Sequence, residues 1–159
     1  MVPKIKKILY ATDLSDSAGH AFGYAADLAQ RYDAMMTVLY VMENMSYIVE
    51  AQVKETLGQK QWDRLTSEKL DYVTQKIESS LKKFCQEEDP PRHLVEDILV
   101  TRGIPPEKIL STSKNINADM IVMGSYGHNI LENVLIGSTA RKVVRHSEIP
   151  VLVIRLPKE

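Results

Sequence analysis

The sequence has a single cysteine and no long apolar run. One cysteine, Cys85, excludes an intramolecular disulfide and any metal site built from several thiolates, and we interpret it as a small apolar residue near a helix end. No segment approaches the ~18 apolar residues that a membrane-spanning helix needs. The basic residues 1–7 resemble the start of a secretory signal, but the apolar stretch after them, residues 8–11, is too short for one. We therefore expect a cytoplasmic protein that does not enter a membrane.

The chain also lacks an excess of charge of either sign. Its 20 basic and 21 acidic residues leave a formal net charge of −1. This balance argues against a surface built mainly to hold nucleic acid or anionic lipid. A length of 159 residues, without internal repeats or linkers, predicts one domain that covers residues 1–159.

Short apolar segments alternate with segments of helical spacing. From Ala18 to Tyr32 the apolar residues recur with the helical period, as they do from Leu70 to Phe84, and Pro105 opens a further helix. Residues 43–60 show no clean period, and we expect them to be irregular or partly helical. The alternation predicts an α/β fold with an open parallel sheet and helices on both faces. The expected strands are residues 7–11, 35–41, 94–101, 119–123 and 149–154.

In such a sheet, ligands bind at the carboxyl ends of the strands, where the strand order reverses. Ala11, Thr12 and Asp13 follow the first strand, and Val41 ends the second. Glycines follow the fourth strand, in the segment GSYGHNILENVLIGST (residues 124–139). We also expect Thr101 and Gly103, after the third strand, to add a wall to the site.

The glycine segment supports two interpretations. Gly124 and Gly127 let the backbone approach a ligand closely, and Ser138 and Thr139 precede a helix whose free N–H groups attract anions. The same residues also suit ordinary turns, with Gly137 as a helix stop and Ser138 as an N-cap. The spacing matches neither of the two common phosphate-binding fingerprints. The residue types alone therefore leave phosphate binding and turn formation both open.

The spacing of this segment resembles a known family. The pattern G-x2-G-x9-G-[ST], after a strand ending IVMG and before PVLVIR, is similar to the ATP-binding branch of the universal stress protein family. The stretches KILYATDLSDSAGHAF, VLYVME and RGIPPEKIL resemble its first strand, loop and helix, its second strand, and its third helix with the preceding turn. The match covers nearly the whole chain and is weakest over residues 44–69.

This resemblance implies a sheet of strand order 3-2-1-4-5 that binds ATP, or a related adenine nucleotide, at the ends of strands one and four. A divalent cation, Mg or Mn, would accompany the nucleotide. Val41 would offer its backbone to the adenine, while Tyr126 stands where the family often has a basic side chain. The residues that the resemblance places around the nucleotide are Ala11, Thr12, Asp13, Val41, Met123, Gly124, Gly127, Gly137, Ser138 and Thr139.

The fifth strand carries a continuous apolar run, Val151, Leu152, Val153 and Ile154, at the expected edge of the sheet. An exposed apolar edge favours association unless something covers it, and the resemblance implies a homodimer formed through this strand.

Three hypotheses of function follow. The first is an ATP-binding stress-response or signalling module whose nucleotide occupancy is read by a protein partner. The second is a slow ATPase or phosphotransferase, for which Asp13 is the sole nominated residue, since no general base or phosphate-binding lysine can be identified. The third is a structural or chaperone-like dimer that binds no nucleotide.

Overall fold

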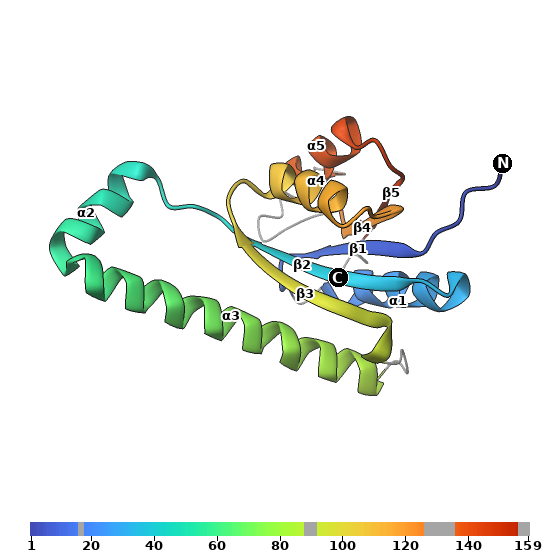
Figure 1. The fold of residues 1–159 in the computed structure, drawn as a ribbon, viewed down its shortest axis with the longest axis horizontal. Coiled ribbons are helices and arrows are strands. Elements are labelled where there is room, and N and C mark those ends of the chain that lie inside the picture. The colour runs from blue at the N-terminus through green and yellow to red at the C-terminus, as the bar shows by residue number, and fades with distance from the viewer. Residues whose placement is uncertain (16–17, 88–91, 126–135, 156–159) are drawn as a thin grey trace.

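The computed structural model describes residues 1–15, 18–87, 92–125 and 136–155. Its strands form one parallel sheet in the order β3-β2-β1-β4-β5 (Figure 1). The predicted fold class and strand order are therefore confirmed. The strands are β1 (Lys7–Thr12), β2 (Met35–Met42), β3 (Val95–Arg102), β4 (Met120–Gly124) and β5 (Val151–Ile154).

Helices cover both faces of the sheet (Figure 1). The helices are α1 (Ala18–Tyr32), α2 (Tyr47–Leu57), α3 (Gln59–Glu87), α4 (Pro105–Asn115) and α5 (Ser138–His146), and a short 3-10 helix spans Arg92–Leu94. Successive side chains of β1 point to opposite faces, as the geometry of a strand requires. Ile8 and Tyr10 pack with α1 and α3 in one apolar core, whereas Leu9 packs with α4 and α5 in a second core. This central position explains why β1 carries fully buried apolar residues on both faces.

Residues 43–60, expected to be irregular or partly helical, are mostly helical in the structure. A short non-helical stretch leads into α2, and Gly58 connects α2 to the long helix α3. The Ser46 hydroxyl caps α2 by accepting a hydrogen bond from the Val49 N–H at 3.4 Å. Gly58 joins the two helices, and the Lys54 ammonium lies 5.3 Å from the Trp62 ring centroid across this joint.

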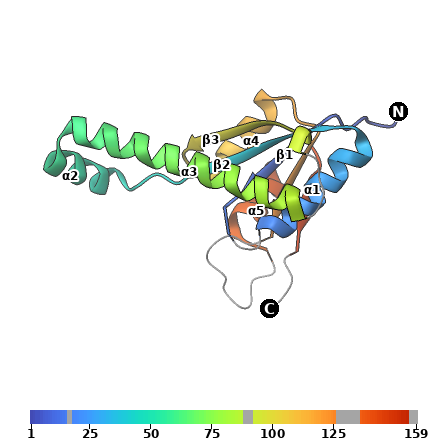
Figure 2. The ribbon, with the colours of Figure 1, turned by 90° about the horizontal axis from the view of Figure 1, so that it is seen from below.

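We call residues 46–72 the helical arm, because both views show α2 and the first half of α3 projecting beyond the sheet (Figures 1 and 2). No residue of α2 is buried, whereas further along α3 the side chains of Val73, Ile77 and Leu81 enter the core. A helix that packs on one neighbour rather than on a sheet needs no broad apolar stripe. That is the reason why the sequence of α2 shows no clean helical period.

The turn after β3 connects the carboxyl edge of the sheet to α4. After β3, Gly103 adopts a φ of 152°, and its N–H donates to the Met42 carbonyl at the end of β2, 2.9 Å away. Ile104 then acts as the N-cap of α4, with proline in the first turn where its missing N–H costs nothing.

Within the described ranges, no helix combines the length and the apolar character that crossing a bilayer requires.

Candidate functional site

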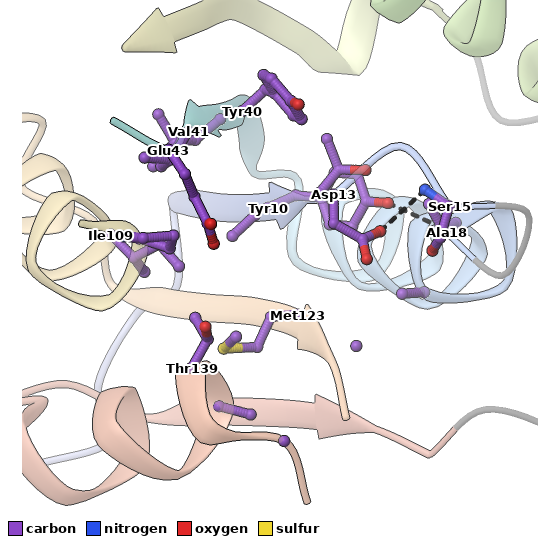
Figure 3. A pocket seen from close by; sticks show the side chains of 18 of the residues that line it. Tyr10, Asp13, Ser15, Ala18, Tyr40, Val41, Glu43, Ile109, Met123 and Thr139 are labelled. Carbon is purple, nitrogen blue, oxygen red and sulfur yellow. Dashed lines mark hydrogen bonds between the residues drawn. The ribbon is translucent and has the colours of Figure 1, made fainter. Parts of the chain in front are cut away.

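A cavity of about 490 Å³ lies at the carboxyl ends of β1, β2 and β4 (Figure 3). This is where the strand order reverses, since β1 is paired with β2 on one side and with β4 on the other. Gly127 falls outside the described residues. The structure brings the other predicted residues together in the cavity wall: Ala11, Thr12, Asp13, Val41, Met123, Gly124, Gly137, Ser138 and Thr139.

The loop after β1 holds Asp13 in a tight turn. The Asp13 carboxylate accepts a hydrogen bond from the Ser15 N–H at 2.9 Å, and the Thr12 hydroxyl accepts one from the Leu14 N–H at 3.2 Å. Leu14 has a φ of 60°, which is uncommon for a residue with a side chain. Through this hydrogen bond the Asp13 carboxylate shapes the loop between β1 and α1.

The end of β2 contributes Tyr40 and Val41 to the wall, and Glu43 follows directly after this strand. Figure 3 shows the Glu43 side chain and the Thr139 side chain of α5 pointing into the cavity from opposite sides. Burial raises the pKa of the Tyr40 phenol, and the carboxylates of Asp13 and Glu43 raise that pKa further. The β1–β2 side of the cavity is therefore electronegative.

The opposite side presents backbone groups. The Gly137 N–H donates to the Ser125 carbonyl at 2.6 Å, and the Ser125 N–H donates to the Ile154 carbonyl at 2.8 Å. These bonds hold the end of β4 next to the start of α5. Ser125 also lines the cavity, and its hydroxyl, in a side chain only 2% exposed, has no hydrogen-bond partner within the described ranges.

Helix α5 begins at the cavity without a side-chain cap. Gly137 occupies the N-cap position and has no side chain that could accept a hydrogen bond from the first N–H groups of the helix. Of the two interpretations of this segment, the one with Gly137 as a helix stop and Ser138 as the N-cap does not hold, because Gly137 is the N-cap and Ser138 is the first residue of α5. The first N–H groups of a helix have no partner within the helix and carry its partial positive charge. This end of the cavity can therefore hold an anion.

The remaining walls differ from the prediction. Pro105 and Ile109 of α4 line the cavity, whereas Thr101 and Gly103 do not. Lys69 of α3 also lines it, although it comes from the helical arm. Tyr40 and Glu43 could have been found as neighbours of Val41, but nothing in the local sequence of α3 indicates Lys69.

Two residues outside the described cavity wall, His146 and Cys85, have structural roles. The Nδ1 atom of His146 lies 2.9 Å from the Lys142 carbonyl oxygen in the last turn of α5. Cys85 is partly buried and packs beside the core. Across the described parts of the chain, no three His, Cys, Asp or Glu side chains gather into a group that could hold a metal ion.

The strand order defines a doubly wound α/β protein, with a cavity at the place where such sheets bind their ligands. The model of the universal stress protein family matches residues 4–155. The chain is 30% identical to universal stress protein MJ0531 of Methanocaldococcus jannaschii over 154 residues, which cover 97% of this chain and 84% of that protein. The chain belongs to the universal stress protein family.

Solved structures agree with this assignment. The structure of MJ0577 from Methanocaldococcus jannaschii has a TM-score of 0.76 at 26% identity, covering 99% of this chain and 100% of that one. A universal stress protein in complex with cAMP shares the fold, with a TM-score of 0.65 at 17% identity, covering 98% of this chain and 100% of that one.

Proposed function

We propose that this protein is an ATP-binding module whose nucleotide occupancy is read by a protein partner. The observation that carries the proposal is the start of α5, which has a glycine N-cap and opens into a cavity of about 490 Å³. Unpartnered N–H groups at a helix start favour phosphate. A cavity of this size is within the range that encloses a small organic ligand.

The nucleotide would lie across the cavity between β2 and α5. Val41 would meet the adenine through its backbone, and Ala11, Thr12 and Asp13 would surround the adenosine. Phosphates and ribose would lie along the fourth strand and the start of α5. The proposed contacts on that side are Met123, Gly124, Gly127, Gly137, Ser138 and Thr139. The relative bound to cAMP supports an adenine nucleotide, because it has the same fold.

A divalent cation, Mg or Mn, would enter together with the phosphates. Two carboxylates, those of Asp13 and Glu43, line the cavity. Magnesium is commonly held by one or two carboxylates together with phosphate oxygens and water, rather than by a cage of protein ligands. The residues present therefore fit a cation that arrives with its nucleotide.

The first experiment identifies what the purified protein carries. Small molecules released by denaturing freshly purified protein are analysed by mass spectrometry, and we expect an adenine nucleotide. Thermal unfolding is then followed with added ATP, ADP, AMP and cAMP. A ligand at 100 times its Kd should stabilise the fold by about 2.7 kcal/mol.

A matched pair of variants connects this stabilisation to the cavity. Thr139→Val removes a hydroxyl from the cavity wall, and we expect a smaller rise in melting temperature with ATP. Thr56→Val removes an exposed hydroxyl that bonds to the Gln52 carbonyl in α2, and the rise should stay as in wild type. If no adenine nucleotide at millimolar concentration raises the melting temperature of the wild type, the proposed function is wrong.

We also propose a homodimer formed through β5. This strand is at one edge of the sheet, and its residues Val151, Leu152 and Val153 are only partly buried in the single chain. Pairing with the same strand of a second copy would cover this edge and satisfy its open backbone groups.

A further inference from the structure

The helical arm and the segment that leads into it both border the cavity. Glu43 lies between the end of β2 and the start of the arm, and Lys69 lies within the arm, on α3. Both residues line the cavity. A bound ligand would therefore meet the arm as well as the loops of the sheet.

The described cavity wall has more negative than positive side chains. Asp13 and Glu43 supply two carboxylates, and Lys69 is the one Lys or Arg side chain among the described lining residues. A nucleotide with several phosphates brings further negative charge into this space. The start of α5 offsets only part of it, because a helix end carries about half an elementary charge. Lys69 therefore carries the one full positive side-chain charge of the described wall that could pair with a polyphosphate.

Lys69 is available for this role. Its side chain is exposed and makes no ion pair with any residue that the structure describes. A lysine ammonium on its flexible four-carbon stem can reach a phosphate without a fixed geometry. Since α2 has no buried residue, few other contacts hold the arm in place.

We propose that Lys69 is a ligand-contacting residue that pairs with the phosphate chain of the bound nucleotide and holds the helical arm over the cavity. This inference rests on the proposed nucleotide binding and adds a contact from outside the loops of the sheet. The pairing requires phosphate, so the contribution of Lys69 should grow from adenosine through AMP and ADP to ATP. A lysine that merely neutralised Glu43 would affect all four ligands alike.

The test measures the Kd of adenosine, AMP, ADP and ATP for wild type, Lys69→Met, Lys69→Arg and Lys76→Met by titration calorimetry. Lys76 lies two turns further along the same face of α3 and does not line the cavity, so it is the matched control. For Lys69→Met we expect roughly threefold to tenfold weaker ATP binding, the range of a partly exposed charge contact, and unchanged adenosine binding. Lys69→Arg should retain most of the ATP affinity, and Lys76→Met should match the wild type.

Hydrogen exchange of residues 47–57 supplies a second measurement. We expect ATP to slow exchange in α2 of the wild type and of Lys76→Met, but much less in Lys69→Met. The inference is overturned if Lys69→Met weakens adenosine and ATP binding equally. It is also overturned if Lys69→Met leaves ATP binding and the protection of the arm unchanged. Either result leaves the nucleotide proposal standing. A wild type that binds none of the four ligands would overturn both.

Discussion

Tyr10 connects the central strand to the first helix beside the cavity. Its hydroxyl donates to the Ala18 carbonyl at 2.8 Å, and its ring packs edge-on against Phe22 with centroids 5.7 Å apart. The side chain is 2% exposed, so water cannot replace the hydrogen bond. Tyr10 thus fixes where α1 begins relative to the loop that carries Asp13.

Replacing Tyr10 with phenylalanine should lower the free energy of unfolding. The change removes one buried hydrogen bond and keeps the ring, so we expect a loss of about 1 kcal/mol in urea denaturation. Tyr24→Phe is the matched control, since Tyr24 is 50% exposed and its hydroxyl can bond to water. Equal stability of the two variants would show that the Tyr10 hydroxyl does not tie β1 to α1.

The burial of Tyr10 also predicts that the free energy of unfolding depends on pH in the alkaline range. Burial raises the pKa of Tyr10 above its ordinary value of 10.0, so the folded state favours the neutral phenol. The stability that Tyr10 contributes is fully present below pH 10 and decreases as the pH rises above it, because the unfolded chain then ionises first. The stability difference between wild type and Tyr10→Phe should therefore shrink between pH 9 and pH 11. Urea denaturation of both proteins over this range measures it, and a difference that grows with pH would contradict the assignment.

At the scale of elements, the joint between the two helices of the arm depends on the backbone conformation of one glycine. Gly58 lies between α2 and α3 with φ 81° and ψ 156°, a conformation open essentially to glycine alone. Nothing lies within 4 Å of the position where a Cβ would be, so the constraint at Gly58 is the backbone and not space.

Gly58→Ala should therefore loosen α2 without disturbing the sheet. The strain is on the order of 1–3 kcal/mol, and α2 is the element that can move to relieve it. We expect faster hydrogen exchange in residues 47–57 and an unchanged rate in β1 and β4. The control is Gly23→Ala in α1, where a Cβ also meets nothing within 4 Å and alanine favours the helix by roughly 0.5–1 kcal/mol. Unchanged exchange in α2 of Gly58→Ala would mean that the joint tolerates a side chain.

At the scale of the whole molecule, the open edge of β5 decides the proposed assembly. The Pro150 carbonyl accepts a hydrogen bond from the Ile121 N–H of β4 at 2.9 Å, and the Ile154 carbonyl accepts one from the Ser125 N–H, just after β4, at 2.8 Å. Backbone groups of alternate residues in a strand point to opposite sides, so the peptide groups of Val151 and Val153 point away from β4. These are the groups that a second copy of β5 would meet.

Val153→Pro should shift the protein from dimer to monomer. Proline removes the outward N–H at the edge and leaves the hydrogen bonds to β4 in place. Sedimentation velocity at micromolar concentration measures the change, with circular dichroism to verify the fold. Val153→Thr keeps both the N–H and the branched shape, and it should remain a dimer. A wild type that sediments only as a monomer would contradict the proposed interface.

The sequence by itself determined the sheet and the edge at which the cavity lies. Each predicted strand corresponds to an observed one, because a buried parallel strand is a short apolar run bounded by turn residues, and these are local signals. Parallel topology then places all the carboxyl ends on one edge. That is why Asp13, Val41 and Thr139, far apart in the chain, could be predicted to meet.

Only the tertiary structure decided which residues complete the cavity. The arm is helical although α2 lacks a clean helical period, because α2 packs chiefly on α3 and buries no residue. Lys69 reaches the cavity because Gly58 turns the chain back and α3 runs toward the sheet. Ile109 lines a wall because α4 packs against β2 and α5. These placements depend on contacts between distant segments, which no local pattern of residue types records. The sequence therefore determined at which edge of the sheet the cavity lies. The packing of distant segments determined which charged side chains line it.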